Sequence, residues 1–329
     1  MTLSILGMGS CQPTTTVLDN KFIEDLNVGT NVEWITDKIG VQTRVTTLPV
    51  DYISKTRNAD PFDVPELDIL SSVDLAVNAA RVACQRAGIS PQQLGMIIVN
   101  CCCPSSLIPS EANRIADKLG ADCNSYEVFT ACPAFALQCD YLNNFRESEL
   151  PEYVLCISTA TMTQHVNYND RTDGAIWGDG AAAWIVSARH PGKLKIVDTA
   201  FYSDPSRASA VVVNTLGHFW QDGRAVRDFS VRQTVRLIKR LEDQYNIDWN
   251  KDVFVGHQAN ATMLRQITDN REVPASNHWH NVTHLGNQAG AGAPAVISEN
   301  WEKIQPGMRI VVAVVGAGLS WGSVMLEGI

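Results

Sequence analysis

The 329-residue sequence has no apolar run of about 18 residues or more, so we expect no transmembrane helix. Its first residues, MTLSILGMGS, lack the basic segment of a secretory signal peptide, and we interpret them as a first strand. The net charge is −9, and no stretch concentrates lysine and arginine, which excludes nucleic acid as a partner. Together these absences predict a cytoplasmic protein that binds neither a membrane nor a nucleic acid.

The nine cysteines do not suggest a disulfide framework, because their number is odd. Free thiols fit a reducing cytosol. Three of them, Cys101, Cys102 and Cys103, are adjacent. Consecutive side chains on a strand point to opposite faces, so this is not the spacing of metal ligands. We interpret the three as small buried apolar residues and expect no metal site.

Strands and helices alternate along the chain, which is typical of a mostly parallel sheet covered by helices. One arrangement of a helix followed by three strands occurs twice. The first copy comprises a helix at 71–88 and strands at 96–101, 125–132 and 153–159; the second comprises a helix at 230–245 and strands at 252–258, 280–287 and 309–318. We infer a duplicated α/β unit whose halves, 1–187 and 188–329, meet near residues 187–195.

The stretch SYEVFTACPAFALQCD places Cys132 where a strand ends and a helix begins. A cysteine there is either a buried apolar residue or a nucleophile whose thiolate the helix N-terminus stabilises. Ligand sites of open α/β sheets lie beyond the carboxyl ends of the strands. Asn287 occupies the matching place in the second half, and His257 ends the strand before it. A pseudo-twofold axis would therefore bring these three side chains together.

This set of side chains suits thioester chemistry. A thiolate attacks acyl carbonyls, and thioester exchange is nearly isoenergetic. His257 and Asn287 offer N–H donors to an oxygen that becomes negative, as in an enolate left by loss of carbon dioxide. The glycine-rich turn in VVGAGLSWGS offers backbone N–H groups for an oxyanion hole. Each feature also has a structural interpretation: a packing histidine, a helix-capping asparagine or a plain turn.

Six motifs in order resemble a thiolase-fold condensing enzyme of the β-ketoacyl-acyl carrier protein synthase III kind. They are NVEWITDKIGVQTR (31–44), TACPAF (130–135), NDRTDGAIWGDGAAA (169–183), HQAN (257–260), GNQAGAGAP (286–294) and GAGLSWGS (316–323). The resemblance implies two duplicated αβα halves with mixed five-stranded sheets in five layers. It also implies Cys132 as acylated nucleophile, His257 and Asn287 assisting decarboxylation, backbone N–H groups of Cys132 and Ala317 as oxyanion hole, and a homodimer.

The resemblance also implies a set of coenzyme A contacts. Trp34 and Arg171 match the two residues that flank the adenine, and Lys38 falls where the family has a basic residue near the phosphates. Asn260 matches a position near the pantetheine arm. The set is chemically sensible, since it combines an aromatic face, a stacking guanidinium and an ammonium group. For Trp34 the alternative is a half-exposed core aromatic.

Departures from the family pattern concern the substrate. Ile108 replaces a bulky aromatic that closes the acyl pocket across the dimer, and Trp177 replaces a phenylalanine on another wall. Thr262 and Ser230 stand where basic residues that dock the acidic carrier protein are common. We expect that other basic residues of the same predicted helix compensate: Arg232, Arg236, Lys239 and Arg240. The segment 204–223 departs most and is expected to line or cover the tunnel.

We therefore predict a ketosynthase that condenses a Cys132-bound acyl group with a malonyl-type or β-ketoacyl thioester. The thioesters arrive on coenzyme A or acyl carrier protein, with no metal or redox cofactor, in fatty acid initiation or specialised metabolism. One alternative is acyl transfer to an oxygen, nitrogen or sulfur nucleophile on the same fold. Another is a non-catalytic dimer partner of a related ketosynthase. A cysteine peptidase shares the order Cys, His, Asn but lacks the papain signature.

Overall fold

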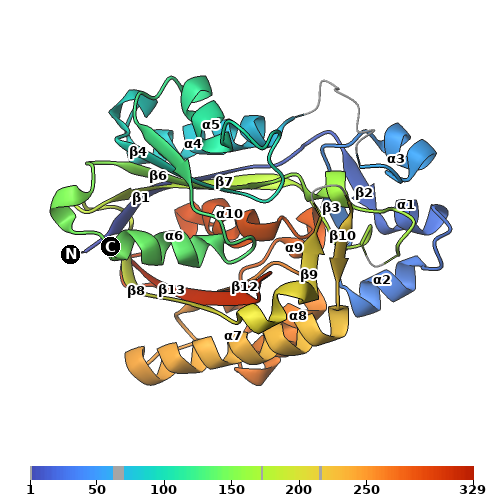
Figure 1. Ribbon diagram of the computed structural model, residues 1–329. Coiled ribbons are helices and arrows are strands. Elements are labelled where there is room, and N and C mark those ends of the chain that lie inside the picture. The colour runs from blue at the N-terminus through green and yellow to red at the C-terminus, as the bar shows by residue number, and fades with distance from the viewer. Residues whose placement is uncertain (1, 62–69, 172, 215–216) are drawn as a thin grey trace.

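The computed structural model describes residues 2–61, 70–171, 173–214 and 217–329 (Figure 1). Nine strands form one hydrogen-bonded sheet in the order β11 (Val253–Gly256), β12 (Arg309–Gly316), β13 (Ser320–Gly328), β8 (Leu194–Ser203), β1 (Ser4–Cys11), β7 (Gly180–Ser187), β6 (Val154–Ala160), β4 (Met96–Cys101) and β5 (Asn124–Glu127). Strands β1 and β8 pair only at Ser4–Lys195 and Ile5–Leu194. The sheet therefore divides there into a five-stranded and a four-stranded part.

Helices separate and cover these two parts, and the result is five layers (Figure 1). Helices α4 (Ser72–Ala87) and α5 (Glu111–Leu119) cover the outer face of the first part. Helices α6 (Ala134–Asn143) and α10 (Gly292–Glu299) lie between the two parts, and α7 (Gly223–Tyr245) and α8 (Ala261–Asn270) lie outside the second. This is the thiolase-like arrangement that the motifs predict, and the fold prediction is confirmed.

Several short strands and helices lie outside the nine-stranded sheet and its covering helices. Two two-stranded antiparallel sheets stand outside the main sheet: β2 (Val17–Asp19) with β3 (Thr43–Val45), and the hairpin of β9 (Val211–Val213) with β10 (Phe219–Gln221). Short helices occupy the connection from β2 to α4: α1 (Asn20–Asp25), α2 (Val32–Lys38) and α3 (Val50–Thr56). The hairpin β9–β10 lies in the divergent segment 204–223.

Local sequence signals set the helix ends. Ser71 and Asp74 form a capping box at the start of α4, and Gly88 ends that helix at φ 70°. Ser110 accepts from the Asn113 N–H at the start of α5, and Gly120 ends α5 at φ 67°. Short polar side chains before the first turn and glycine after the last one are what these backbone positions require. The predicted helix at 71–88 is thus confirmed within one residue at each end.

One predicted strand is wrong. Residues 280–287 contain the short helix α9 (Val282–Leu285), and only an isolated bridge between Phe254 and His278 extends the second part of the sheet beyond β11. The Gln258 side-chain oxygen accepts from the backbone N–H groups of Asn281 and Val282, at 3.0 and 3.2 Å. These are donors that a strand would give to its neighbour. Gly286 then turns the chain at φ 76°.

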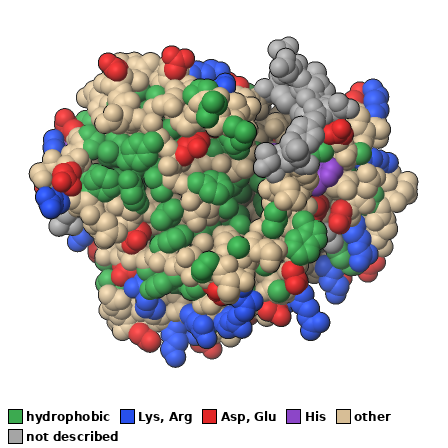
Figure 2. Space-filling model, viewed as in Figure 1, with side chains coloured by type: hydrophobic (Ala, Val, Ile, Leu, Met, Phe, Trp, Pro, Cys, Tyr) green, Lys and Arg blue, Asp and Glu red, His purple; other side chains and the backbone are tan. Residues whose placement is uncertain are grey.

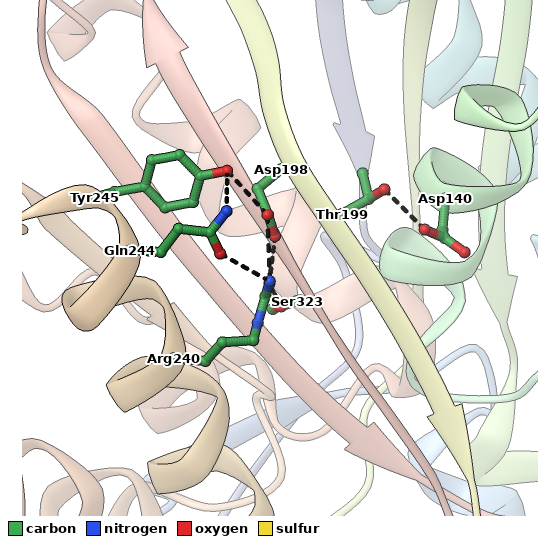
Figure 3. Close-up of polar contacts among 7 residues, drawn as sticks. All are labelled: Asp140, Asp198, Thr199, Arg240, Gln244, Tyr245 and Ser323. Atoms are coloured by element: carbon green, nitrogen blue, oxygen red, sulfur yellow. Dashed lines mark hydrogen bonds and ion pairs between the residues drawn. The ribbon is translucent and has the colours of Figure 1, made fainter.

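Helix α7 is anchored to the second part of the sheet by a polar cluster (Figure 3). The guanidinium of Arg240 donates to both carboxylate oxygens of Asp198 on β8 and to Ser323 on β13. The Tyr245 hydroxyl donates to Asp198 at 3.0 Å. The expectation that Arg240 faces a carrier protein is therefore wrong, because its charge is used inside the fold. Arg232, Arg236 and Lys239 are exposed, and Figure 2 shows basic side chains along the edge where α7 runs.

We expect the Arg240→Met substitution to lower the free energy of unfolding by about 2 kcal/mol, between the values for exposed and fully buried pairs. The physical reason is that the Asp198 side chain is only 10% exposed and would lose its cation. Urea denaturation measures the effect. Arg236→Met, on the exposed side of the same helix, is the matched control and should change stability by less than about 0.5 kcal/mol. Equal midpoints for the two variants would contradict the prediction.

Candidate active site

Cys132 lies in a tight turn between β5 and the central helix α6. Strand β5 ends at Glu127, so the expected strand through residue 132 is too long. The Asn100 side chain holds the turn: its oxygen accepts from the Thr130 N–H at 3.0 Å and its nitrogen donates to the Ala131 carbonyl at 3.3 Å. Ala131 takes φ 53°, a conformation that L residues rarely adopt. The turn therefore presents Cys132 two residues before α6 begins.

Burial dominates the electrostatics of the Cys132 thiol. It raises the pKa of the thiol well above its ordinary value, and the neighbouring Cys102 thiol raises the pKa further. The sequence predicted the opposite, a pKa lowered by the helix N-terminus. That prediction is wrong for the free thiol, because removal of water from the anion outweighs the local N–H groups. The thiol is thus protonated at neutral pH, and an attack by its sulfur would require a base.

His257 is the residue after β11. Its backbone N–H donates to the carbonyl of Ala313 on the neighbouring strand β12, at 3.0 Å, which continues the pairing of the two strands. Its side chain is buried, and burial lowers the pKa of the imidazole to about 4. The ring is therefore neutral at neutral pH and has one N–H donor and one lone pair. Its Nδ1 atom is buried without a protein partner among the described residues. A neutral imidazole can accept a proton or donate one to a developing oxyanion.

Asn287 is fixed by both its backbone and its side chain. Its N–H donates to the Ile176 carbonyl at 2.8 Å, and its carbonyl accepts from the Gly178 N–H at 3.0 Å. The side-chain oxygen accepts from the Ala289 N–H at 3.0 Å. Because this bond occupies the oxygen end of the amide, the NH₂ end is the one available to a ligand. Asn287 precedes the second central helix α10, as Cys132 precedes α6.

The three residues line one cavity of about 100 Å³, which we name the tunnel cavity. A second cavity of about 460 Å³ adjoins it at Cys132, and we name it the acyl-side cavity. Trp177, Phe219, Val211 and Ala317 line both. The structure thus brings together Cys132, His257 and Asn287 from distant parts of the sequence, as the duplicated topology predicts.

Gly316 ends β12, Ala317 follows it, and Gly316 lies against the turn that carries Cys132. A Cβ atom on Gly316 would lie 2.8 Å from the Cys132 Cβ, 3.1 Å from the Cys132 N and 2.6 Å from the Pro133 Cδ. No L side chain fits at that spacing, so glycine permits the close approach of the two segments. The approach puts the Ala317 backbone beside Cys132 at the junction of the two cavities.

The expected coenzyme A contacts gather on α2 and its surroundings. The Arg171 guanidinium carbon lies 4.7 Å from the centre of the Trp34 ring, and Arg171 also donates to the Gly29 carbonyl at 3.1 Å. Lys38 is exposed in the last turn of α2. Asn260 lines the tunnel cavity, where its side chain also caps α8 by accepting from the Met263 N–H at 2.7 Å. An adenine between Trp34 and Arg171 would replace their cation–π contact, worth about 0.5–1 kcal/mol at an exposed site.

The two expected acyl-pocket residues differ in position. Trp177 is buried and packs edge to face against Phe219, with ring centroids 4.7 Å apart. Ile108 is 84% exposed and lines neither cavity. Sequence reasoning missed Cys102 and Met162, which line the acyl-side cavity. The aromatic pair Phe219 and Trp220 of segment 204–223 is expected from the sequence either to shape the pocket or to pack under a loop; Phe219 lines both cavities, and Trp220 is exposed and lines neither. No sequence signal points to Met162.

In the described part of the chain, no group of three or more His, Cys, Asp or Glu side chains is placed to hold a metal ion. None of its helices combines the length and the apolar character needed to cross a bilayer.

Comparisons with known proteins agree with this geometry. Residues 126–205 match the family 3-oxoacyl-[acyl-carrier-protein (ACP)] synthase III, and residues 247–327 match the C-terminal family of the same synthase. The β-ketoacyl-[acyl-carrier-protein] synthase III of Syntrophomonas wolfei is 29% identical, over 99% of this chain and 98% of its own. The crystal structure of 3-oxoacyl-[acyl-carrier-protein] synthase III from Aquifex aeolicus VF5 superposes with a TM-score of 0.86 at 25% identity, over 99% of both chains.

The fold and these matches define a thiolase-fold enzyme with a cysteine at the start of a central helix. More closely, it is a β-ketoacyl-acyl carrier protein synthase III-like condensing enzyme, similar to these synthases along almost its whole length. A likeness at lower identity shows the fold alone: the priming β-ketosynthase of the R1128 polyketide pathway has a TM-score of 0.82 at 22% identity, over 99% of this chain and 96% of its own.

Proposed function

We propose that the protein is a ketosynthase, an acyltransferase that joins an acyl group to a malonyl-type thioester with loss of carbon dioxide. The observation that carries the proposal is the tunnel cavity, which is lined by a cysteine, a neutral histidine and an asparagine with its amide nitrogen available. The names of the matched families and relatives support the same reaction. Fatty acid initiation and specialised polyketide-type metabolism both use this chemistry.

The first half-reaction loads the enzyme. The Cys132 sulfur attacks the carbonyl carbon of an acyl thioester, and a new carbon–sulfur bond forms as the bond to the carrier thiol breaks. The proton of Cys132 passes to the departing thiol, with neutral His257 as the base in the same cavity. Backbone N–H groups of Cys132 and Ala317 stabilise the tetrahedral oxyanion. The acyl chain then occupies the acyl-side cavity, where Trp177 contributes to the wall.

The second half-reaction forms the carbon–carbon bond. A malonyl-type thioester loses carbon dioxide, and the electron pair of the broken bond becomes an enolate. His257 and Asn287 donate hydrogen bonds to the enolate oxygen, which carries charge only after the bond begins to break. The carbanion carbon attacks acyl-Cys132, and the thiolate leaves and takes up a proton. The product is a β-ketoacyl thioester, and the reaction needs no metal or redox cofactor.

The carrier and assembly proposals follow the same family pattern. Trp34 and Arg171 would hold the adenine of coenzyme A, Lys38 its phosphates, and Asn260 the pantetheine arm. We propose a cytoplasmic homodimer of chains with halves at 1–187 and 188–329. Supporting features are the edge strand β5, which pairs only with β4 among the described strands, and the exposed Leu107, Ile108 and Phe129. Across such an interface Ile108 would reach the partner's acyl pocket.

Intact-protein mass spectrometry with a panel of acyl-coenzyme A and acyl-carrier-protein thioesters tests the proposal. The expected result is one acyl mass increment on the native protein and none on Cys132→Ala, because no other thiol has this position. Cys102→Ala, which removes a neighbouring thiol of the acyl-side cavity, should still load. Loading of Cys132→Ala, or no loading from either carrier, would overturn the proposal.

A further inference from the structure

Among the described residues that line the tunnel cavity, one carries a permanent charge, and its side chain is also exposed to solvent. Arg227, in the first turns of α7, lines this cavity together with Cys132, His257 and Asn287. No Asp or Glu appears among its described lining residues. His257 is neutral at neutral pH, because burial lowers its pKa to about 4. The tunnel cavity is therefore positive, although the chain as a whole carries a net charge of −9.

No carboxylate of the described residues forms an ion pair with Arg227. Its Nη2 donates to the side-chain oxygen of Gln266 on α8 at 3.0 Å, which is a neutral acceptor. Arg227 takes part in none of the ion pairs found in the described residues. The acid at the start of the same helix, Asp222, uses its carboxylate to cap the Ala225 N–H at 3.1 Å.

The N-terminus of α7 is a second source of positive charge at the tunnel cavity, besides Arg227. Gly223, the first residue of the 23-residue helix α7, also lines the tunnel cavity. A helix N-terminus carries partial positive charge, so cations in the first turns are disfavoured there. Arg224 and Arg227 nevertheless occupy this end of the helix. Such an arrangement is electrostatically favourable once an anion binds beside it.

The chemistry of the reaction narrows the choice of anion. An ion pair between arginine and the carboxylate of a malonyl-type thioester would stabilise the ground state and slow the loss of carbon dioxide. The other anion of both thioester carriers is the phosphate at the end of the pantetheine arm. The position of Arg227 suits that end, because its partner helix α8 begins at Ala261, whose N–H donates to the Ile39 carbonyl beside Lys38.

We propose that Arg227 is a specificity residue that binds the phosphate of the phosphopantetheine arm. It makes the site select phosphorylated thioesters over otherwise identical pantetheine thioesters. The inference rests on the proposed function and names which part of the substrate this residue recognises. The phosphate is common to coenzyme A and to the carrier protein, so Arg227 serves both. Arginine suits this task because its planar guanidinium forms paired hydrogen bonds to phosphate oxygens.

Calorimetric binding of two probes, phosphopantetheine and pantetheine, tests the proposal without any chemical turnover. The Cys132→Ser protein should bind phosphopantetheine at least about tenfold more tightly. Adding Arg227→Gln should reduce that preference to less than about threefold and leave pantetheine affinity unchanged. Arg146→Gln, at a side chain that is 83% exposed and outside both cavities, is the control and should keep the preference.

Three results would overturn the proposal: equal weakening of both probes by Arg227→Gln, a preference that survives it, or binding of neither probe. Acyl loading from coenzyme A, carrier protein and pantetheine thioesters then separates the two phosphate sources. Arg227→Gln should slow loading from the first two and spare the third. If the phosphate preference is present but Cys132 never loads, the proposed function fails while the role of Arg227 stands.

Discussion

Replacing Asn287 by aspartate is expected to lower the rate of carbon–carbon bond formation by about a hundredfold to a thousandfold, the usual loss for one oxyanion donor. The side-chain oxygen of Asn287 is held by the Ala289 N–H, so its NH₂ end faces the ligand. Aspartate keeps that acceptor and loses the donor to the enolate. It also places negative charge where negative charge develops. Acyl loading of Cys132 should change by less than about threefold, because it forms no enolate.

Single-turnover experiments check both half-reactions on one preparation, with mass spectrometry for loading and release of carbon dioxide for decarboxylation. His257→Ala should show the same loss of decarboxylation, and the double variant should lose little more, since both donors act on one oxygen. The imidazole acts in its neutral form, and its pKa of about 4 means that His257 adds no pH dependence between pH 6 and 8. An equal loss of loading and decarboxylation in Asn287→Asp would show that the substitution merely distorts the site.

Gly316→Ala is expected to lower the rate of acyl loading by about a hundredfold. The added methyl group would lie 2.8 Å from the Cys132 Cβ and 2.6 Å from Pro133 Cδ, too close for any rotamer change to relieve. Either Cys132 or the end of β12 must shift. In the proposed mechanism Cys132 is the nucleophile and the N–H of Ala317, the residue after Gly316, belongs to the oxyanion hole. A shift at this contact would therefore change both.

The same mass-spectrometric loading assay, followed over time, measures this effect. Gly217→Ala is the matched control, because a Cβ there would meet only the Asn214 Cβ, at an ordinary 3.5 Å, and Gly217 lines neither cavity. It should load at the native rate. Unfolding midpoints of the two variants should both be measured, since loss of loading in a natively stable Gly316→Ala protein is the informative result. Native loading by that variant would contradict the close contact between Gly316 and Cys132.

Much of the site could be predicted because its parts are local signals repeated in a duplicated fold. Residues 71–88 carry their own capping serine and closing glycine, so their helix needs no tertiary contact to be recognised. Cys132 and Asn287 stand at matching places before the two central helices. Topology then brings them to the same end of the sheet. The order of strands and helices along the chain is therefore enough to predict that Cys132, His257 and Asn287 lie close together.

Other properties depended on long-range contacts. Residues 280–287 read as a strand, but the side chain of Gln258 takes their backbone donors and a short helix forms instead. Arg240 looks like any other basic residue of α7, yet Asp198 on β8 turns it toward the sheet. No periodicity encodes such pairings, because each partner lies more than twenty residues away.

The sequence by itself determined the class of fold, both ends of the helix at 71–88 and three of the residues that line the tunnel cavity, Cys132, His257 and Asn287. It did not determine the start of α7, which begins at Gly223 and not at residue 230. Only the tertiary structure decided their chemical state and surroundings. Burial raises the pKa of the Cys132 thiol and lowers that of His257, although an exposed helix N-terminus would have made the cysteine acidic. The packing of distant segments also places Phe219 and Met162 in the wall of the acyl-side cavity. Burial and cavity shape arise from the packing of distant segments, whereas capping and order of elements are properties of the chain itself.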